Sequence, residues 1–355
     1  MEKQYLESDI VIIGAGLTGL TLAYLLRHSG MKVTIVEARD RIGGRIFTKG
    51  YENNQPLEMG ATWLGHQHGR LKELLQELGI STFDQVIGAA AIYEAISTSP
   101  PYLAQLPPNP EPSMRIQGGS EKIIHTLASH INQSDILLNE VVSDIKETDE
   151  GVTLATTSYT ISANKVISTL PPNLFVNSID CQPKLPNDVI HLAKATHTWM
   201  GESIKISLTY AEPFWRAENL SGTIMSNVGP IGEMYDHSNY EDSFYALKGF
   251  FSGNYFSITK EERVAMIMHQ LNKYFGSKAE KYIEYNEVVW RNEPHTFTPY
   301  DSHVLPHQNN GDPIYQKNYM NGKLIIGGTE TSTSYPGYME GAVYSAMYIA
   351  NKILN

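Results

Sequence analysis

The chain has 355 residues, of which 41% are hydrophobic and 18% are charged, and its formal net charge is -11. This length predicts two domains, and the composition is that of a globular protein and excludes a disordered one. The acidic surplus argues against nucleic acid or an anionic membrane as partners, because both require a basic surface. No run approaches the roughly 20 apolar residues of a membrane helix. We therefore expect a cytoplasmic protein without a membrane anchor, and the lone thiol of Cys181 suits that reducing compartment.

The first forty residues have the order of elements of a βαβ unit. Residues 9–13 have a buried-strand pattern with an apolar run at residues 10–13, and the glycine motif of residues 14–19 follows directly. Residues 20–28 predict a helix that ends at Gly30, and residues 32–36 predict a second strand. This is the context in which a G-x-G-x-x-G motif binds a dinucleotide.

Each glycine of the motif has a physical purpose. Gly14 permits the tight turn, Gly16 lets the backbone approach a pyrophosphate, and Gly19 lets the helix pack close to the sheet. The helix N-terminus offers free N–H groups and a positive dipole end to the phosphates. Glu37, at the end of the second strand, can accept hydrogen bonds from both ribose hydroxyls and would repel a 2′-phosphate. The motif thus favours NAD or FAD over NADP.

The segment after the second strand separates NAD from FAD. Residues 37–45 have the sequence E-A-R-D-R-I-G-G-R, where a plain NAD domain would enter another crossover helix. Arg45 follows a double glycine and can reach the pyrophosphate as a fixed positive fork. The segment resembles the E-A-R-D-R-x-G-G-R signature of the flavin-containing amine oxidase family, which includes the monoamine and polyamine oxidases. The resemblance favours FAD as the cofactor.

Further blocks along most of the chain resemble the same family. They are residues 58–63, 118–120, 139–142, 168–172, 200–206, 327–330 and 335–342. The resemblance implies that FAD is bound by Gly14, Gly16, Leu17, Thr18, Gly19, Glu37, Ala38, Arg39, Gly44, Arg45, Gly60, Ala61, Thr62, Trp63, Val142, Trp290, Gly328, Thr329, Glu330, Gly337, Tyr338, Met339 and Ala342.

The predicted fold class is α/β (α+β overall), with a Rossmann-like FAD-binding domain interleaved with a smaller mixed-sheet substrate domain. We expect the FAD-binding domain to comprise residues 1–83, 113–195 and 292–355, and the substrate domain to comprise residues 84–112 and 196–291.

Local patterns predict individual elements of both domains. Residues 203–210 and 244–250 alternate and predict strands of the substrate domain, and residues 260–275 predict its helix. Near the C-terminal end, residues 323–326 predict a short strand and residues 341–353 an amphipathic helix. A helix N-terminus aimed at the flavin would stabilise negative charge on the reduced ring.

The resemblance implies an FAD-dependent oxidase. Such an enzyme transfers a hydride from an amine carbon to flavin N5, which gives an imine and, with O2, hydrogen peroxide. The expected partners are a small-molecule amine and O2, and the chain length and acidic surface suit either a monomer or a homodimer.

Three residues are expected to carry the catalysis. The resemblance assigns Tyr338 and Tyr300 as two rings that flank the amine over the flavin. Tyr300 is reached by counting on from Trp290 and lacks the usual flanking glycines, so a core or surface role for it stays open. Lys205 matches the segment whose lysine holds a water near N5, although a lysine on the polar side of a strand is usually solvated.

Attachment of the flavin is expected to be non-covalent. Some family members use a cysteine thioether just before the Tyr300 position, but here that position is Pro299 and Cys181 lies far away in sequence. The 12 histidines show no metal-ligand spacing, so we expect no metal. His66 and His68 either line the substrate side or lie in a surface loop.

One departure from the family concerns the wall of the substrate cavity. Long members carry a helical insertion between the blocks that here contain Gly60 and Gly118. In this chain the interval is short, and its Pro-rich part, residues 95–112, cannot be helical. Either the site is open and takes a bulky substrate, or another subunit closes it.

Other functions remain compatible with the sequence. A different flavin oxidoreductase, such as a desaturase or a protoporphyrinogen-type or nicotinamide-derivative oxidase, could use the same scaffold. A flavin-binding protein without turnover is a third hypothesis. An amino-acid oxidase would need a cation for the substrate carboxylate, and nothing in the sequence places Arg70 or Arg216 in the cavity.

Overall fold

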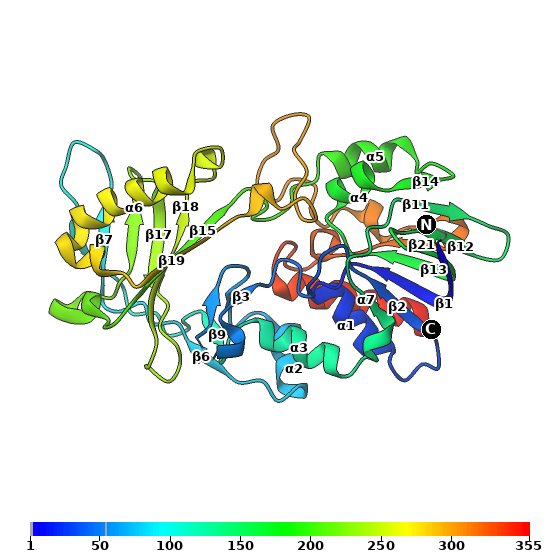
Figure 1. The fold of residues 1–355 in the computed structure, drawn as a ribbon, viewed down its shortest axis with the longest axis horizontal. Helices are drawn as coiled ribbons and strands as arrows, with labels where there is room; N and C mark the ends of the chain where they lie inside the picture. The colour runs from blue at the N-terminus through cyan, green and yellow to red at the C-terminus, as the bar shows by residue number, and fades with distance from the viewer. Residues whose placement is uncertain (1–2, 54) are drawn as a thin grey trace.

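The computed structural model describes residues 3–53 and 55–355, and residues 1, 2 and 54 of the expected FAD-binding domain lie outside the described residues. The chain builds one nine-stranded sheet, one seven-stranded sheet and two small sheets. Figure 1 shows an elongated molecule with the two large sheets at opposite ends and the small sheets between them. The predicted α/β (α+β) fold class, with a Rossmann-like part and a mixed sheet, is confirmed.

The nine-stranded sheet contains the βαβ unit predicted from the first forty residues. Its order is β10-β2-β1-β13-β12-β11-β14, and β21 joins β13 and β20 at one side. Pairing is parallel from β10 through β13 to β21 and antiparallel around β12. The strands are β1 (Gln4–Ile13), β2 (Val33–Val36), β10 (Ile136–Leu137), β11 (Asp144–Glu147), β12 (Val152–Ala155), β13 (Tyr159–Ser168), β14 (Asp180–Gln182), β20 (Asn318–Tyr319) and β21 (Leu324–Ile326).

Helices cover both faces of this sheet, which explains the continuous apolar run in β1. Ile10 and Ile12 pack with α1, α2, α3 and α7, whereas Val11 and Ile13 face the core that contains α4 and α5. A parallel strand buried on both faces needs apolar residues at every position. The helices are α1 (Leu17–Leu26), α2 (Gly69–Glu77), α3 (Glu121–Ser129), α4 (Pro172–Ser178), α5 (Asn187–Lys194) and α7 (Met339–Leu354).

The seven-stranded sheet has the order β19-β15-β18-β17-β16-β7-β8 and carries one long helix on one face. That helix, α6 (Lys260–Phe275), begins with a capping box and packs against Ile204, Ile206 and Leu208 of β15. Residues between these positions therefore point to the opposite face. The strands are β7 (Ala90–Glu94), β8 (Tyr102–Gln105), β15 (Ile204–Tyr210), β16 (Ile224–Ser226), β17 (Ile231–Asp236), β18 (Tyr245–Phe251) and β19 (Glu284–Val289).

The remaining elements are short. The small sheets pair β3 (Thr48–Lys49) with β4 (Leu57–Glu58), and place β9 (Met114–Ile116) between β5 (Trp63–Leu64) and β6 (Thr82–Asp84). Short 3-10 helices occur at Tyr51–Asn53, Gln133–Asp135, Phe214–Asn219, Gly253–Tyr255, Gly276–Lys281, Trp290–Asn292, Pro313–Gln316, Met320–Gly322 and Thr329–Thr331.

The Pro-rich interval, residues 95–112, contains no helix, as predicted, but it does contain a strand that we did not predict. β8 pairs antiparallel with β7 and forms an edge of the seven-stranded sheet. Prolines bracket the four residues of β8 and leave each of their N–H groups in place, so this stretch alone can pair. The predicted C-terminal helix also starts two residues early, at Met339, with Tyr338 at the N-cap position.

Candidate active site

A single cavity of about 920 Å³ extends from the glycine motif to the seven-stranded sheet. Its lining begins at Gly14 in the turn after β1 and reaches Phe250 in β18. The end at the glycine motif is the dinucleotide end, and the end at the seven-stranded sheet, with Lys205 and Phe250, is the substrate end.

Glycines at the dinucleotide end allow backbone segments to approach closely. Gly14 has φ +104°, and a Cβ there would lie 2.8 Å from the hydroxyl of Thr169. A Cβ on Gly19 would lie only 2.0 Å from the carbonyl oxygen of Gly14. Gly16 lines the cavity at the N-terminus of α1, where helical N–H groups are free for phosphate oxygens. At Gly14 and Gly19, but not at Gly16, a Cβ would require neighbouring atoms to shift.

The carboxylate of Glu37 is fixed by main-chain donors at the end of β2. It accepts hydrogen bonds from the N–H of Ala15 at 2.8 Å and from the N–H of Arg39 at 3.0 Å. The residue is buried and lines the cavity. A carboxylate held in this way presents fixed acceptors to hydroxyl groups, as a ribose requires.

The double-glycine loop folds back onto the glycine motif. The N–H of Gly43 donates to the carbonyl of Ala15 at 2.8 Å, and the guanidinium of Arg41 donates to three carbonyls of its own loop. Arg45 then forms two hydrogen bonds with the buried carboxylate of Glu330, at 2.5 and 2.8 Å. Burial alone would lower the pKa of Arg45, but the charge of Glu330 raises it above its usual value.

Most residues expected to bind FAD line this one cavity. They are Gly14, Gly16, Leu17, Thr18, Glu37, Ala38, Arg39, Gly44, Arg45, Gly60, Ala61, Thr62, Trp63, Val142, Trp290, Thr329, Gly337, Tyr338, Met339 and Ala342. The cavity lining does not include Gly19, Gly328 or Glu330. Gly19 lies against Gly14, Gly328 lies against Thr169, and Glu330 binds Arg45.

These features fit FAD. The cavity connects a βαβ dinucleotide turn with a distant sheet, Gly14 and Gly19 keep that turn tight, and its lining offers a carboxylate and an arginine, the groups that a ribose and a pyrophosphate would need. FAD held here would supply the two-electron chemistry that the side chains of the cavity lack.

Lys205 reaches the substrate end from the inner face of β15. Its side chain is 5% exposed, so the solvated role is excluded, and its Nζ donates to the carbonyl of Gly60. The amine also lies 5.2 Å from the centroid of the Phe250 ring. Burial lowers the pKa of Lys205 to about 8, although the charge of Glu58 opposes this effect. Lys205 therefore gives up its proton at a lower pH than an ordinary lysine.

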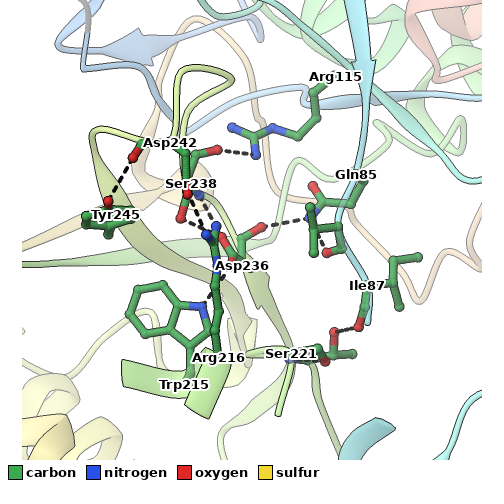
Figure 2. A network of polar contacts seen from close by, with 12 residues as sticks. Gln85, Ile87, Arg115, Trp215, Arg216, Ser221, Asp236, Ser238, Asp242 and Tyr245 are labelled. Atoms are coloured by element: carbon green, nitrogen blue, oxygen red, sulfur yellow. Dashed lines mark hydrogen bonds and ion pairs between the residues drawn. The ribbon is translucent and has the colours of Figure 1, made fainter. Parts of the chain in front are cut away.

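Trp63 forms an aromatic wall that a buried polar network positions. Its indole N–H donates to the side-chain carbonyl of Gln85 at 2.8 Å, and the amide of Gln85 donates to the carbonyl of Asp236 at 2.7 Å. Figure 2 shows that the Asp236 carboxylate in turn accepts from Trp215 and Arg216. The Trp63 ring lies 5.4 Å from Tyr235 and 5.9 Å from Phe250.

The structure places the two expected catalytic tyrosines differently. Tyr338 lines the cavity and contacts the rings of Trp199 and His307, at centroid distances of 5.6 and 5.8 Å. Tyr300 is absent from the lining, and its hydroxyl instead accepts a hydrogen bond from the N–H of Thr198 at 2.8 Å. The expected pair of facing rings is therefore not brought together.

The remaining candidates lie outside the cavity lining. His68 is buried and accepts a hydrogen bond from the N–H of Gly65, whereas His66 is partly exposed. Cys181 is buried in β14, where burial raises the pKa of its thiol to about 12. Neither it nor Pro299 lines the cavity, in keeping with a flavin held without a thioether.

Sequence reasoning missed several cavity residues. At the dinucleotide end these come from α4 and from the loop after the 3-10 helix Trp290–Asn292. The guanidinium of Arg39 donates to the hydroxyl of Thr296 in that loop at 2.8 Å. At the substrate end they come from β17, β18, the loop after β6 and the residue before β9. They are Leu174, Ser178, Ile179, Pro294, His295, Thr296, Gln85, Ile87, Ser113, Glu233, Tyr235 and Phe250. Only the alternating pattern of β18 gave a signal, because it puts Phe250 opposite the core positions.

Comparison with known proteins identifies the family. The model of the family described as flavin containing amine oxidoreductase matches residues 17–111 and 99–354, which is nearly the whole chain. The protein belongs to this family, and it is an FAD-dependent amine oxidase. The two matched stretches meet at residues 99–111, within the Pro-rich interval.

Similar proteins match nearly the whole of this chain. A probable flavin-containing monoamine oxidase A of Dictyostelium discoideum is 24% identical, with 97% of each chain covered. Human amine oxidase [flavin-containing] B is 24% identical over 98% of this chain and 86% of its own. Among solved structures, a putrescine oxidase bound to putrescine has a TM-score of 0.86 at 24% identity, with 98% of this chain and 99% of that chain covered. A cyclohexylamine oxidase from Brevibacterium oxydans has a TM-score of 0.86 at 21% identity, with 98% of each chain covered.

The comparisons also bear on the missing cavity wall. The Dictyostelium alignment spans 450 positions whereas this chain has 355 residues, so at least 95 positions of that relative have no counterpart here. This agrees with the short interval found in the sequence. Separately, none of the helices in the described part of the chain is long and apolar enough to span a membrane.

Proposed function

We propose that the protein oxidises diamines, in which one amine is oxidised and the other is bound as a cation by Glu233. The observation that carries this proposal is the place of Glu233, the one carboxylate among the described residues that lines the substrate end. The other two lining carboxylates, Glu37 and Glu140, lie together at the dinucleotide end, where the N–H of Glu140 donates to the carbonyl of Glu37.

Sheet register aligns Glu233 with Lys205. Phe250 of β18 is opposite Lys205 on one side and opposite Glu233 of β17 on the other. Two strand spacings put the Glu233 and Lys205 backbones roughly 10 Å apart. Phe250 between them offers an apolar surface for a short methylene chain. The carboxylate is exposed at the outer part of the cavity and accepts a hydrogen bond from the Tyr235 hydroxyl at 2.9 Å.

The roles of the other side chains follow from their positions. Trp63 and Phe250 would hold the hydrocarbon part of the amine, and Tyr338 would cover it from the side of α7. Lys205, with a pKa of about 8, would exchange a proton with a nearby water or oxygen species. Bound FAD would accept a hydride from the amine carbon and return the electrons to O2 as hydrogen peroxide. A bound putrescine in the fold relative is in keeping with this substrate class.

The cellular setting belongs to the same proposal. We propose a cytoplasmic monomer or homodimer in which residues 1–83, 113–195 and 292–355 hold FAD and residues 84–112 and 196–291 hold the amine. The lone buried thiol and the acidic surface support this setting.

The test compares a diamine with a monoamine of the same chain length. In the Glu233→Gln variant, the concentration of 1,4-diaminobutane that half-saturates flavin reduction should rise at least about tenfold, because a charged hydrogen bond is lost. Butylamine should be unaffected. Glu261→Gln, an exposed change on α6, is the matched control. Equal loss for both amines, or no loss for the diamine, would refute the role of Glu233.

A further inference from the structure

A second lysine, Lys248, is completely buried beside the cavity and has no part in the chemistry described so far. It lies in β18 with 0% exposure, opposite Ser207 of β15 and Tyr235 of β17. Lys248 and Phe250 are two residues apart on a strand, so both side chains point to the inner face of the sheet. A lysine buried this deeply is unfavourable unless its amine has a specific partner.

The amine of Lys248 is engaged with the segment that borders the cavity. Its Nζ donates to the hydroxyl of Thr62 and lies 4.8 Å from the centroid of the Trp63 ring. The Thr62 hydroxyl donates to the carbonyl of Gly60 at 3.2 Å, and the same carbonyl accepts from Lys205. A hydrogen-bonded path therefore runs from Lys248 through Thr62 to the acceptor of Lys205.

A simpler interpretation would make Lys248 the counter-ion of Glu58, but the contacts do not favour it. The Glu58 oxygens accept from the N–H of Ser120 and from the hydroxyl of Thr48. Among the described residues, Lys248 forms no ion pair with Glu58 within 4.0 Å. The partner that Lys248 does contact is neutral.

The surrounding charges act against a second ammonium group. The groups that face Lys248 are Lys205 of β15, Glu58 of β4, Arg115 of β9 and His237 after β17. Burial lowers the pKa of Lys248 well below its usual value, and the charge of Lys205 lowers it further, while Glu58 opposes both effects. Burial likewise lowers the pKa of Arg115 to about 10, and it raises that of Glu58. One carboxylate faces three basic side chains, so an uncharged Lys248 amine suits this cluster best.

We propose that Lys248 is a positioning residue that fixes the Gly60–Trp63 segment, and with it the Trp63 wall and the acceptor of Lys205, through its contacts with Thr62 and Trp63. Without the amine, the Thr62 hydroxyl could turn away from Gly60, and the indole would lose the group that covers its face. This inference assumes that FAD and the amine lie against that segment, as proposed above.

The Lys248→Met variant separates the two interpretations. Methionine fills a similar volume, so loss of an uncharged amine should leave the thermal stability of the FAD-loaded protein at neutral pH the same or higher, whereas loss of a counter-ion would lower it sharply. The rate of flavin reduction by 1,4-diaminobutane at saturation should fall about tenfold, because the reacting groups are misplaced. Lys248→Gln keeps an N–H donor for Thr62 and should recover most of that rate. Lys260→Met, an exposed change at the start of α6, should behave as the wild type.

The pH dependence of unfolding gives a measurement that does not depend on turnover. An uncharged Lys248 binds no proton in the folded state, whereas the unfolded chain binds one up to about pH 10.4. In the wild type, the unfolding equilibrium constant should therefore fall about tenfold per pH unit between the folded and unfolded pKa values of Lys248. This pH dependence should be absent from Lys248→Met.

Two results would overturn the proposal. One is a Lys248→Met protein that is stable and reduces its flavin at the wild-type rate. The other is that Lys248→Met and Lys248→Gln are both destabilised and that the pH dependence of unfolding in Lys248→Met equals that of the wild type. Lys248 would then be a charged partner of Glu58. Failure of 1,4-diaminobutane to reduce the wild type would count against the diamine proposal instead, and the stability measurements would still test Lys248.

Discussion

The dinucleotide end and the substrate end of the cavity are built by different means. At the dinucleotide end, the key groups are backbone atoms of two short segments, residues 14–19 and 37–45, with Glu37 and Arg45 fixed by nearby partners. At the substrate end, the key groups are side chains of Lys205, Phe250 and others that only sheet register brings together. Backbone sites tolerate almost no change, whereas side-chain sites can be altered one group at a time.

The largest expected effect lies in the glycine motif. Gly19→Ala would put a Cβ 2.0 Å from the carbonyl oxygen of Gly14, which forces α1 away from β1. We expect the purified variant to contain essentially no FAD, as measured by flavin absorbance per protein. The control is Gly69→Ala in α2, where a Cβ meets no atom within 4 Å. That change should leave the FAD content intact. A Gly19→Ala protein with full FAD would contradict our account of this end.

Glu330→Gln should have the next largest effect. It removes the charge that compensates Arg45, whose guanidinium stays in a mostly buried position. Breaking such a pair should lower the free energy of unfolding by about 3 kcal/mol, measured by denaturant titration, and weaken FAD binding as well. Glu284→Gln removes an exposed pair with Lys49 and should change stability by less than about 1 kcal/mol. Equal effects of the two changes would show that Arg45 is not held by Glu330.

At the substrate end, Lys205→Met should slow reoxidation of the reduced flavin by O2. A fixed positive charge in a buried site is typically worth about 100-fold, so we expect a decrease of that order in stopped-flow experiments. In the wild type the rate should fall as the pH rises through about 8, because burial places the pKa of Lys205 there and the ammonium exists below it. The variant should show no such step. A step near pH 8 that survives in Lys205→Met would assign it to another group.

The smallest effect is expected for Tyr300→Phe. Its hydroxyl accepts one hydrogen bond from Thr198 and lies outside the cavity lining, so stability should fall by about 1 kcal/mol with less than a twofold change in flavin reduction. Tyr338→Leu removes a ring that lines the cavity and should slow reduction by about tenfold. If the two changes slowed reduction equally, Tyr300 would have a catalytic role that its position here does not suggest.

The contrast between the two ends also explains what could be predicted from sequence. The βαβ unit, Glu37 and Arg45 were predictable because local chain geometry brings them together within 45 residues. Lys205 was found through its motif, but its burial was not, because one strand cannot show what covers its polar face.

Glu233 and Gln85 left no recognisable pattern. Glu233 reaches the cavity because β17 pairs with β18, and Gln85 because it bridges Trp63 and Asp236, which are 173 residues apart in sequence. Such contacts depend on long-range pairing, which periodicity does not encode. Tyr300 shows the opposite problem, because counting from Trp290 located a tyrosine that does not line the cavity.

The most direct test of the central claim is a spectrum of the purified protein without oxygen. FAD bound in this cavity should give a yellow protein, and 1,4-diaminobutane should bleach the visible band, which should return when air is admitted. A yellow protein that neither diamines nor monoamines bleach would contradict amine oxidation at this site. A colourless protein that does not take up added FAD would contradict the cavity assignment itself.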